Sequence, residues 1–316
     1  MEALKYIGRR LLRLVLIVLG VTFLSFGMMR LAGGDAVTYL YENAGAAVSQ
    51  EVLDQARAQY GLDKPFLVQY LTWLTGMLRG DMGTSYVSGN DVFASFASRL
   101  PATAQLAGAS LLLTLLVSVP LGILAAVRRD RWVDYVIRFF SFAGNSTPNF
   151  LAALLLIYFF AIRLGWLPSI SGGNGPIGIL LPALTLSLSM SAKYTRQIRA
   201  LVLEELSKGY VAGARARGIK ERVILFRYVL RSALMTLVTL VSLSAGSLLG
   251  GTAVAETIFM WDGVGKLAVD AISMRDYPIV LAYVAWMAVI YVLINLVVDL
   301  LYLLLDPRVR TGGSRA

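Results

Sequence analysis

Neither cysteine nor histidine occurs among the 316 residues of this chain. Without cysteine the chain can form no disulfide, no thiolate metal site and no cysteine nucleophile. Without histidine it lacks the commonest general base and the commonest transition-metal ligand, so an active site or metal site would have to consist of carboxylates, hydroxyls and thioethers. We therefore predict that the chain is not an enzyme and holds no catalytic residue, cofactor or metal of its own.

Charged side chains are scarce as well, at 15% of the residues, whereas hydrophobic side chains make up 57%. A water-soluble domain of this size could not bury so much apolar surface in one core, so the chain belongs in a bilayer. About 20 apolar residues are needed to cross the hydrocarbon core as a helix. The uncharged stretches predict an all-α membrane protein with six transmembrane helices, at residues 14–29, 100–127, 139–162, 177–192, 232–255 and 277–298.

The first apolar stretch follows four basic residues, Lys5, Arg9, Arg10 and Arg13, as the core of a secretory signal does. Cleavage of such a signal would leave five spans. The run is longer than a usual signal core and no A-x-A site follows it, so we predict a retained anchor. Both alternatives place the N-terminus in the cytoplasm.

The net charge of +10 follows this topology. Of the 29 Lys and Arg residues, 21 lie in the segments that share the N-terminal side of the membrane. The positive-inside rule therefore predicts that the N- and C-termini are both cytoplasmic. Because orientation accounts for the basic balance, we expect membrane lipid and no nucleic acid as a partner.

The predicted spans divide the chain into three parts. These are an N-terminal tail with span one (1–30), an extracytoplasmic insertion (31–99) and a five-span core (100–316). Within the insertion we expect a helix at 49–60, with Ser49 as its N-cap and Gly61 at its C′ position. A second helix is expected at 65–78, with Pro65 in its first turn.

The cytoplasmic segment 200–231 joins spans four and five. We expect the fourth span to continue as a helix to Leu206, to break at Gly209, and to be followed by a turn that Gly218 caps in a left-handed conformation. Between the two glycines, small side chains would let a partner approach the backbone, with arginines at the edges. The predicted docking residues are Tyr210, Ala212, Gly213, Ala214, Arg215, Ala216, Arg217 and Gly218. The alternative is a basic segment attracted to anionic lipid.

Two serine pairs at helical spacing are candidates for the lining of a transport path. They are Ser187 with Ser191 and Ser244 with Ser247. Helix packing is the alternative role, because small polar residues of membrane helices commonly serve it.

The external loop between spans five and six contains Trp261, Asp262, Gly263 and Gly265. The stretch 262–266 lacks the spacing of a phosphate-binding loop, so we expect no nucleotide there.

Residues 210–234, read as Y-V-A-G-A-R-A-R-G-I-K-E-R-V-I-L-F-R-Y-V-L-R-S-A-L, resemble the cytoplasmic coupling loop of bacterial ABC importer permeases of the dipeptide, oligopeptide and nickel family. Further similar motifs follow the family order: G-L-D-K-P at 61–65, G-D-M-G-T-S at 80–85, L-P-A-T at 100–103, P-N-F at 148–150, G-W-L-P at 165–168, E-T-I-F at 256–259 and R-D-Y-P at 275–278. The order from L-P-A-T to R-R-D-R at 128–131 is most similar to the nickel-type B subunit. Tyr228 stands where the family usually has histidine, and Asp262 where it usually has proline.

The resemblance implies one transmembrane subunit of an ATP-driven importer in the bacterial inner membrane. It implies as partners a second homologous permease subunit, two ABC ATPase subunits that bind ATP and magnesium, and an extracytoplasmic solute-binding protein. The expected substrate is nickel or another transition metal carried as a small chelate, which fits the lack of histidine and cysteine. A di- or oligopeptide is the alternative.

A secondary transporter is the alternative of another class. It would need intramembrane charges or an inverted repeat, and the sequence shows neither.

Overall fold

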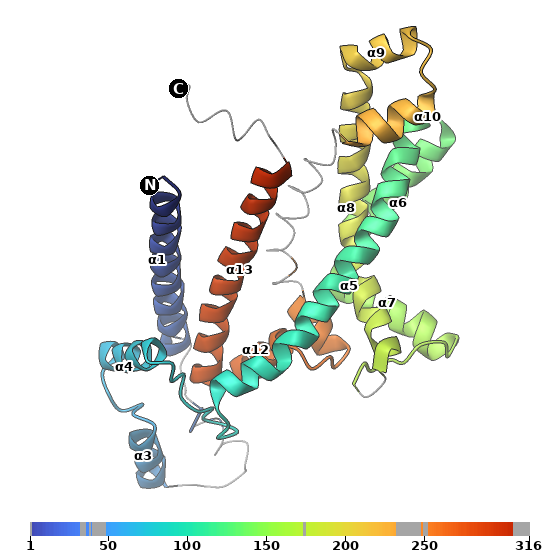
Figure 1. Cartoon of the computed structure of the whole chain (residues 1–316). Helices are drawn as coiled ribbons and strands as arrows, with labels where there is room; N and C mark the ends of the chain where they lie inside the picture. The colour runs from blue at the N-terminus through green and yellow to red at the C-terminus, as the bar shows by residue number, and fades with distance from the viewer. Residues whose placement is uncertain are drawn as a thin grey trace. The chain divides into compact units, whose positions relative to one another are not determined.

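The computed structural model describes residues 2–31, 36–37, 39, 49–172, 175–231, 248 and 252–305. The chain forms two compact units, one of Met1–Thr103 with Asp262–Val292 and one of Ala104–Trp261 with Leu293–Ala316. The named helices are α1 (Glu2–Leu31), α3 (Gln50–Gln59), α4 (Phe66–Leu78), α5 (Val92–Val127), α6 (Trp132–Ser146), α7 (Asn149–Leu156), α8 (Leu180–Leu206), α9 (Gly209–Ala216), α10 (Glu221–Val223), α12 (Val264–Ser273) and α13 (Tyr277–Leu305) (Figure 1). Short π-helical stretches follow α7 at Ile157–Arg163 and α10 at Ile224–Val229, and a 3-10 helix, Gly175–Ile179, leads into α8.

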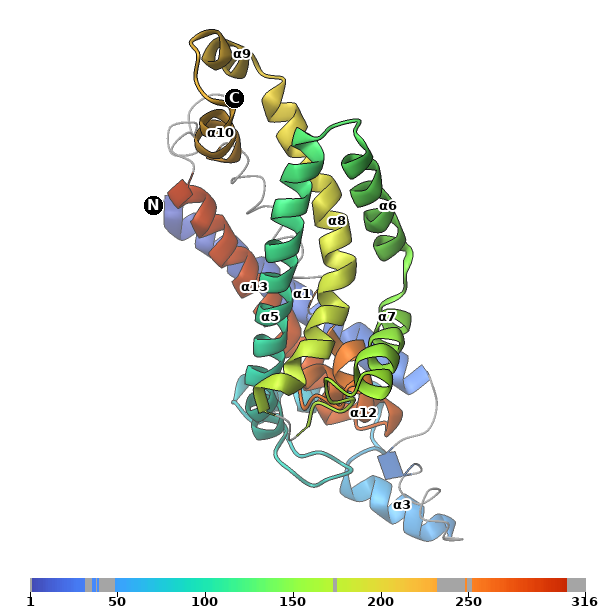
Figure 2. The ribbon, with the colours of Figure 1, turned by 90° about the vertical axis from the view of Figure 1, so that its right-hand side faces the viewer.

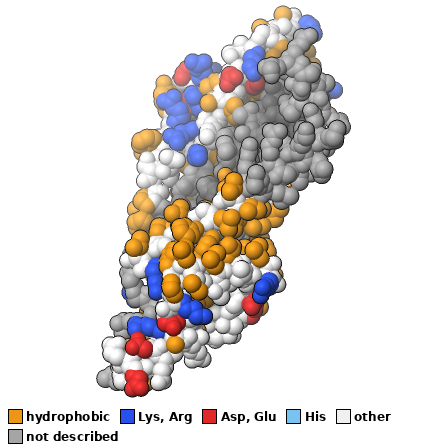
Figure 3. Space-filling model, turned by 90° about the vertical axis from the view of Figure 1, so that its left-hand side faces the viewer, with side chains coloured by type: hydrophobic (Ala, Val, Ile, Leu, Met, Phe, Trp, Pro, Cys, Tyr) orange, Lys and Arg blue, Asp and Glu red, His pale blue; other side chains and the backbone are white. Residues whose placement is uncertain are grey.

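Four helical stretches are long and apolar enough to cross a membrane: Leu14–Leu31, Val92–Val127, Gly175–Leu206 and Tyr277–Val297. They correspond to predicted spans one, two, four and six. Large hydrophobic side chains stay exposed along them, and Figure 3 shows hydrophobic side chains gathered in a broad patch on one face. Such a surface suits lipid rather than water.

The predicted fifth span, 232–255, lies outside the described residues except for Leu248 and residues 252–255. The count of six spans and their orientation therefore stay predictions.

The predicted third span is wrong as a single straight helix. In its place α6 and α7, the latter with its π-helical extension, meet at an angle of 105°. Thr147 leaves the helix with a ψ of 122°, and Pro148 follows as the N-cap residue of α7. Proline disfavours a helical conformation of the residue before it, and it has no N–H to donate to the preceding turn.

The two helices predicted in the insertion are confirmed as α3 and α4. Ser49 is the N-cap residue of α3, although its side chain makes no capping hydrogen bond. Gly61 follows this helix with a φ of 66°, and Pro65 is the N-cap residue of α4.

In the first unit, α4 packs against α1 and the beginning of α13. Phe26, Tyr70 and Leu281 form the buried cluster between them. Thr22 Oγ1 lies 3.1 Å from Tyr70 Oη, so the polar atom of one helix has its partner on another.

The loop after α4 is held by a buried carboxylate. Asp276 accepts hydrogen bonds from Ser85 Oγ at 2.5 Å and from the backbone N–H of Tyr86 at 3.0 Å. Burial nevertheless raises the pKa of Asp276.

In the second unit, α5, α8 and α6 run beside one another (Figure 2). A β-carbon at Gly122 of α5 would lie 2.7 Å from the β-carbon of Ile198 on α8. The missing side chain therefore lets these helices approach closely, as small residues do in membrane helix pairs. Gly144 plays the same part between α6 and α8, where Ala192 is its nearest neighbour.

Candidate coupling site

Two residues separate the end of α8 from the beginning of α9 (Figure 1). Lys208 is the N-cap residue of α9 and has an extended conformation. The helix break therefore lies at Ser207 and Lys208, whereas Gly209, the predicted position of the break, is already helical. At the other end Gly218 has a φ of 74°, and Ile219 N donates to Ala214 O at 3.2 Å. The prediction that α8 continues beyond the apolar stretch and that Gly218 caps the next helix is confirmed.

One face of α9 is buried. Val211 and Ala214 are almost fully shielded and pack with Ile198, Val202 and Ile224. These partners come from α8 and from the π-helical stretch after α10, so α9 is fastened to the elements on both sides of it. Interiors packed in this way transmit displacement rather than absorb it.

The opposite face of α9 is open. Ala212, Gly213, Ala216 and Arg217 are exposed, and a β-carbon at Gly213 would meet nothing within 4 Å. The structure therefore divides the predicted docking residues into an exposed group and Ala214, which faces inward.

Glu205 supports the beginning of α9, although it was not among the predicted site residues. Its carboxylate accepts a hydrogen bond from Tyr210 Oη at 2.7 Å and pairs with Lys208 Nζ. Burial raises the pKa of Tyr210 to about 12, and the bond to Glu205 adds to this shift. Glu204 and Glu205 are the only acids between Lys193 and Lys220, which is the signal that could have drawn attention to them.

Arg215 forms an ion pair with another residue of the predicted cytoplasmic segment, Glu221. Its Nε and Nη2 donate to the two carboxylate oxygens of Glu221 at 2.6 and 3.3 Å. This hydrogen bonding lowers the pKa of Glu221. Arg215 therefore closes the turn between α9 and α10, which leaves Arg217 as the arginine at the open edge.

The candidate path residues are only partly described. Ser187 Oγ donates to Leu184 O at 3.0 Å, and Ser191 Oγ lies 3.5 Å from Thr114 O of α5. Both side chains are buried. Ser244 and Ser247 lie outside the described residues, so the role of this second pair stays a prediction.

The predicted external loop begins with Trp261, which packs in the second unit beside Phe259. In the first unit, Asp262 accepts a hydrogen bond from Arg99 Nε at 2.8 Å. Gly263 is the N-cap residue of α12, and Gly265 is buried inside that helix. The two glycines thus serve the helix start.

The comparisons with known proteins decide the family. A sequence model described as "Binding-protein-dependent transport system inner membrane component" matches residues 118–311, and a model of the N-terminal part of such components matches residues 3–107. The chain belongs to this family. It is therefore a permease of the inner membrane that works with a solute-binding protein and an ATPase.

Three relatives are similar to this permease along nearly their whole length. The oligopeptide transport system permease protein AppB of Bacillus subtilis is 40% identical, with 96% of this chain and 98% of the relative covered. The probable D,D-dipeptide transport system permease protein DdpB of Escherichia coli is 38% identical, with coverage of 95% and 96%. The glutathione transport system permease protein GsiC of Salmonella typhimurium is also 38% identical, with coverage of 97% and 99%.

Among solved structures, the permease is similar in fold to chains of the MetNI methionine ABC transporter in inward-facing conformations. Two such chains give TM-scores of 0.53 and 0.54 at 17% and 19% identity. They cover 68% and 66% of this chain and 97% and 95% of the solved chains.

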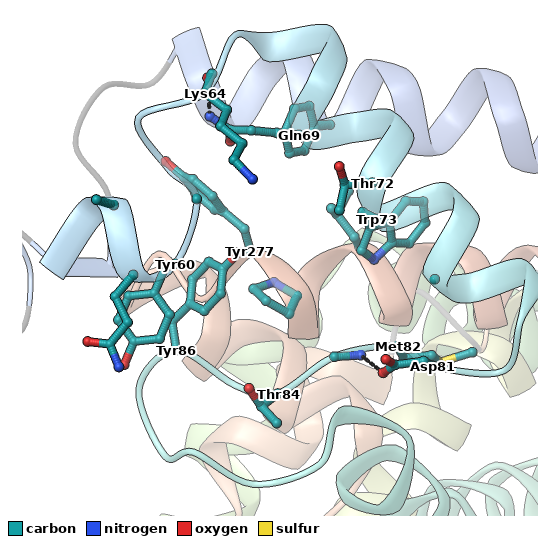
Figure 4. Close-up of a pocket in the computed structure, with 18 residues that line it drawn as sticks. Tyr60, Lys64, Gln69, Thr72, Trp73, Asp81, Met82, Thr84, Tyr86 and Tyr277 are labelled. Atoms are coloured by element: carbon teal, nitrogen blue, oxygen red, sulfur yellow. Dashed lines mark hydrogen bonds between the residues drawn. The ribbon is translucent and has the colours of Figure 1, made fainter. Parts of the chain in front are cut away.

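A cavity of about 430 Å³ lies in the first unit of the permease, lined by Phe26 of α1, by residues between 58 and 86 on and around α4, and by the beginning of α13. Tyr60 and Tyr86 lie at the lower left of the view, Lys64 at its top and Trp73 at its right (Figure 4). Burial raises the pKa of Tyr86 to about 12. Sequence reasoning did not identify this cavity, because its residues come from three distant segments.

Proposed function

We propose that the permease passes di- or oligopeptides across the membrane. The observation that carries this proposal is the 38–40% identity, over nearly the whole chain, to permeases named for oligopeptide, D,D-dipeptide and glutathione transport. These names favour the peptide alternative over the nickel chelate, which the motif order had suggested. The absence of histidine and cysteine is compatible with both substrates, because neither requires metal ligands from this chain.

The proposed complex contains this chain, a second homologous permease subunit, two ATPase subunits that bind ATP and magnesium, and an extracytoplasmic binding protein. The open face of α9, formed by Ala212, Gly213, Ala216 and Arg217, is the proposed contact for one ATPase. Because Val211 and Ala214 fasten α9 to its neighbours, movement of the ATPase would be passed to α8. The permease itself makes and breaks no covalent bond; it shifts between conformations that bind its partners differently.

Uptake by the assembled transporter in proteoliposomes tests the substrate. With the binding protein outside and ATP inside, we expect accumulation of a labelled peptide and no accumulation of radioactive nickel, with or without an organic chelator. A vesicle set without ATP is the control. ATP-dependent nickel uptake in the absence of peptide uptake would reverse the assignment.

A further inference from the structure

A groove on the second unit is lined by three arginines and three aromatic residues. They come from α6 and α8 and are Tyr135, Arg138, Phe139, Phe142, Arg196 and Arg199. We call this set the arginine-aromatic groove. Both helices belong to segments that are apolar enough to lie in a membrane.

One arginine of the groove, Arg199, forms an ion pair with a buried carboxylate. Arg199 donates from Nε and Nη2 to the carboxylate of Asp134 at 2.7 and 2.6 Å. Asp134 is fully buried and also accepts a hydrogen bond from the backbone N–H of Asp130 at 3.1 Å. Both oxygens of the Asp134 carboxylate therefore already accept hydrogen bonds within the protein.

Within the described part of the chain, the other two arginines make no ion pair at hydrogen-bonding distance. The hydrogen bond from Arg199 lowers the pKa of Asp134, and Arg138 is close enough to that carboxylate to add to this shift. None of the ion pairs between described residues involves Arg138 or Arg196. The Arg138 guanidinium lies over the ring of Tyr135, 5.0 Å from the ring centroid. Two exposed guanidinium groups thus lie just beyond the predicted ends of two spans, at the level where a basic side chain can meet a lipid headgroup.

The aromatic wall is also uncovered. Phe139 and Phe142 are 67% and 66% exposed, so each presents most of its ring surface to the surroundings. An occupant of this groove must combine an anionic group with an apolar chain.

We propose that the arginine-aromatic groove binds an anionic phospholipid, with the phosphate between Arg138 and Arg196 and an acyl chain along Phe139 and Phe142. The planar guanidinium fork suits phosphate oxygens, and a phospholipid alone supplies the phosphate and the chain together. Free phosphate would leave the aromatic wall bare, and a protein partner would have to bring its own carboxylate. The predicted orientation places the groove toward the cytoplasmic side, where anionic headgroups attract basic residues.

Native mass spectrometry of the purified full-length chain tests this site. Phosphatidylglycerol is titrated into the detergent-solubilised chain, with phosphatidylcholine as the neutral comparison, and the number of retained lipids is counted. For the double variant Arg138→Gln with Arg196→Gln we expect a loss of affinity for phosphatidylglycerol of roughly thirtyfold, the equivalent of about 2 kcal/mol for two basic residues near an anionic surface. Arg138→Lys with Arg196→Lys keeps the charge and should recover part of the affinity.

The matched control removes the same charge elsewhere. Arg222 and Arg227 are exposed arginines of the segment after α9. Their double glutamine variant should bind phosphatidylglycerol as the unaltered chain does. Equal loss in both double variants would show attraction by diffuse charge and overturn the site, as would retention of the lipid by the groove variant.

A label in the groove separates lipid from protein as the occupant. Because the chain has no cysteine, Phe142→Cys carries a unique thiol for a fluorophore. In the assembled transporter we expect brominated phosphatidylglycerol to quench this fluorophore more strongly than brominated phosphatidylcholine. If neither lipid quenches the fluorophore, a protein subunit covers the groove. If both lipids quench it equally, the groove does not select anionic lipid. Either result contradicts the proposal.

Discussion

Ala212 and Ala214 are two residues apart on α9 and point to opposite environments. Ala214 is 1% exposed and packs with Val211 and Ile224, whereas Ala212 is exposed. The two alanines therefore offer a matched pair of positions on one short helix.

We expect Ala214→Leu to lower the free energy of unfolding by about 1–3 kcal/mol, because extra methylenes overpack a filled interior. Ala212→Leu should change it by less than about 0.5 kcal/mol, as exposed substitutions do. Thermal unfolding of the purified chain in detergent measures both. A similar melting temperature for the two variants would contradict the inward position of Ala214.

At Gly218 the predicted left-handed cap is confirmed, and Gly213 is exposed, while its docking role stays a prediction; both features depend on local properties. A glycine in a left-handed cap and a glycine on an open surface need no knowledge of distant segments. The inward position of Ala214 and the role of Glu205 depend on what α9 packs against. Those partners, Ile198 and Ile224, could not be located from composition.

The close contact between α5 and α8 depends on Gly122. A β-carbon there would also lie 3.0 Å from Thr195 O, so both backbone and side-chain atoms oppose any larger residue. Gly108 lies on the same helix and has no neighbour within 4 Å of its β-carbon position, which makes it a suitable control.

Gly122→Leu should destabilise the fold by about 1–3 kcal/mol or more, because the helices must separate to admit the side chain. Gly108→Leu should leave stability almost unchanged. Denaturation in detergent, followed by the loss of helical circular dichroism, compares the two. Equal stability would show that α5 and α8 do not approach at Gly122.

Long apolar elements and their caps were predictable, whereas the bend between α6 and α7 was not. Residues 139–162 form one uncharged run, so their hydropathy alone does not predict a helix break within it. Pro148 was the visible signal, but proline in a membrane helix can also produce only a kink. The angle of 105° is a property of packing, and Ser189 Oγ on α8, which lies 2.7 Å from Asn149 Oδ1, helps to fix α7 in place.

We predict the orientation of the whole chain from the distribution of lysine and arginine. The absence of native cysteine makes this directly testable. Ser88 lies in the predicted external insertion and Arg222 in the predicted cytoplasmic segment, and both are exposed.

In intact spheroplasts, a membrane-impermeant maleimide should label Ser88→Cys and leave Arg222→Cys unlabelled until the cells are permeabilised. The positive-inside bias is the physical reason for this expectation. The unaltered chain is the blank for background labelling. Labelling of Arg222→Cys before permeabilisation would invert the topology.

Membership of a membrane permease family could be anticipated from composition and motifs, whereas the substrate could not. The sequence motifs do not identify a substrate, and the serine pairs fit helix packing as well as a path. The nickel prediction rested on motif order, and the names of the relatives favour peptides instead.

The most direct measurement concerns Gly213 in the reconstituted transporter. Gly213→Trp places a large ring on the open face of α9, so we expect the amount of peptide imported per ATP hydrolysed to fall by roughly tenfold, the equivalent of about 1.4 kcal/mol at a packed contact. Membrane insertion should be unaffected, and Gly108→Trp, which adds the same ring elsewhere, should keep the normal ratio. An unchanged ratio of uptake to hydrolysis in Gly213→Trp would contradict the role of α9 as the contact with the ATPase.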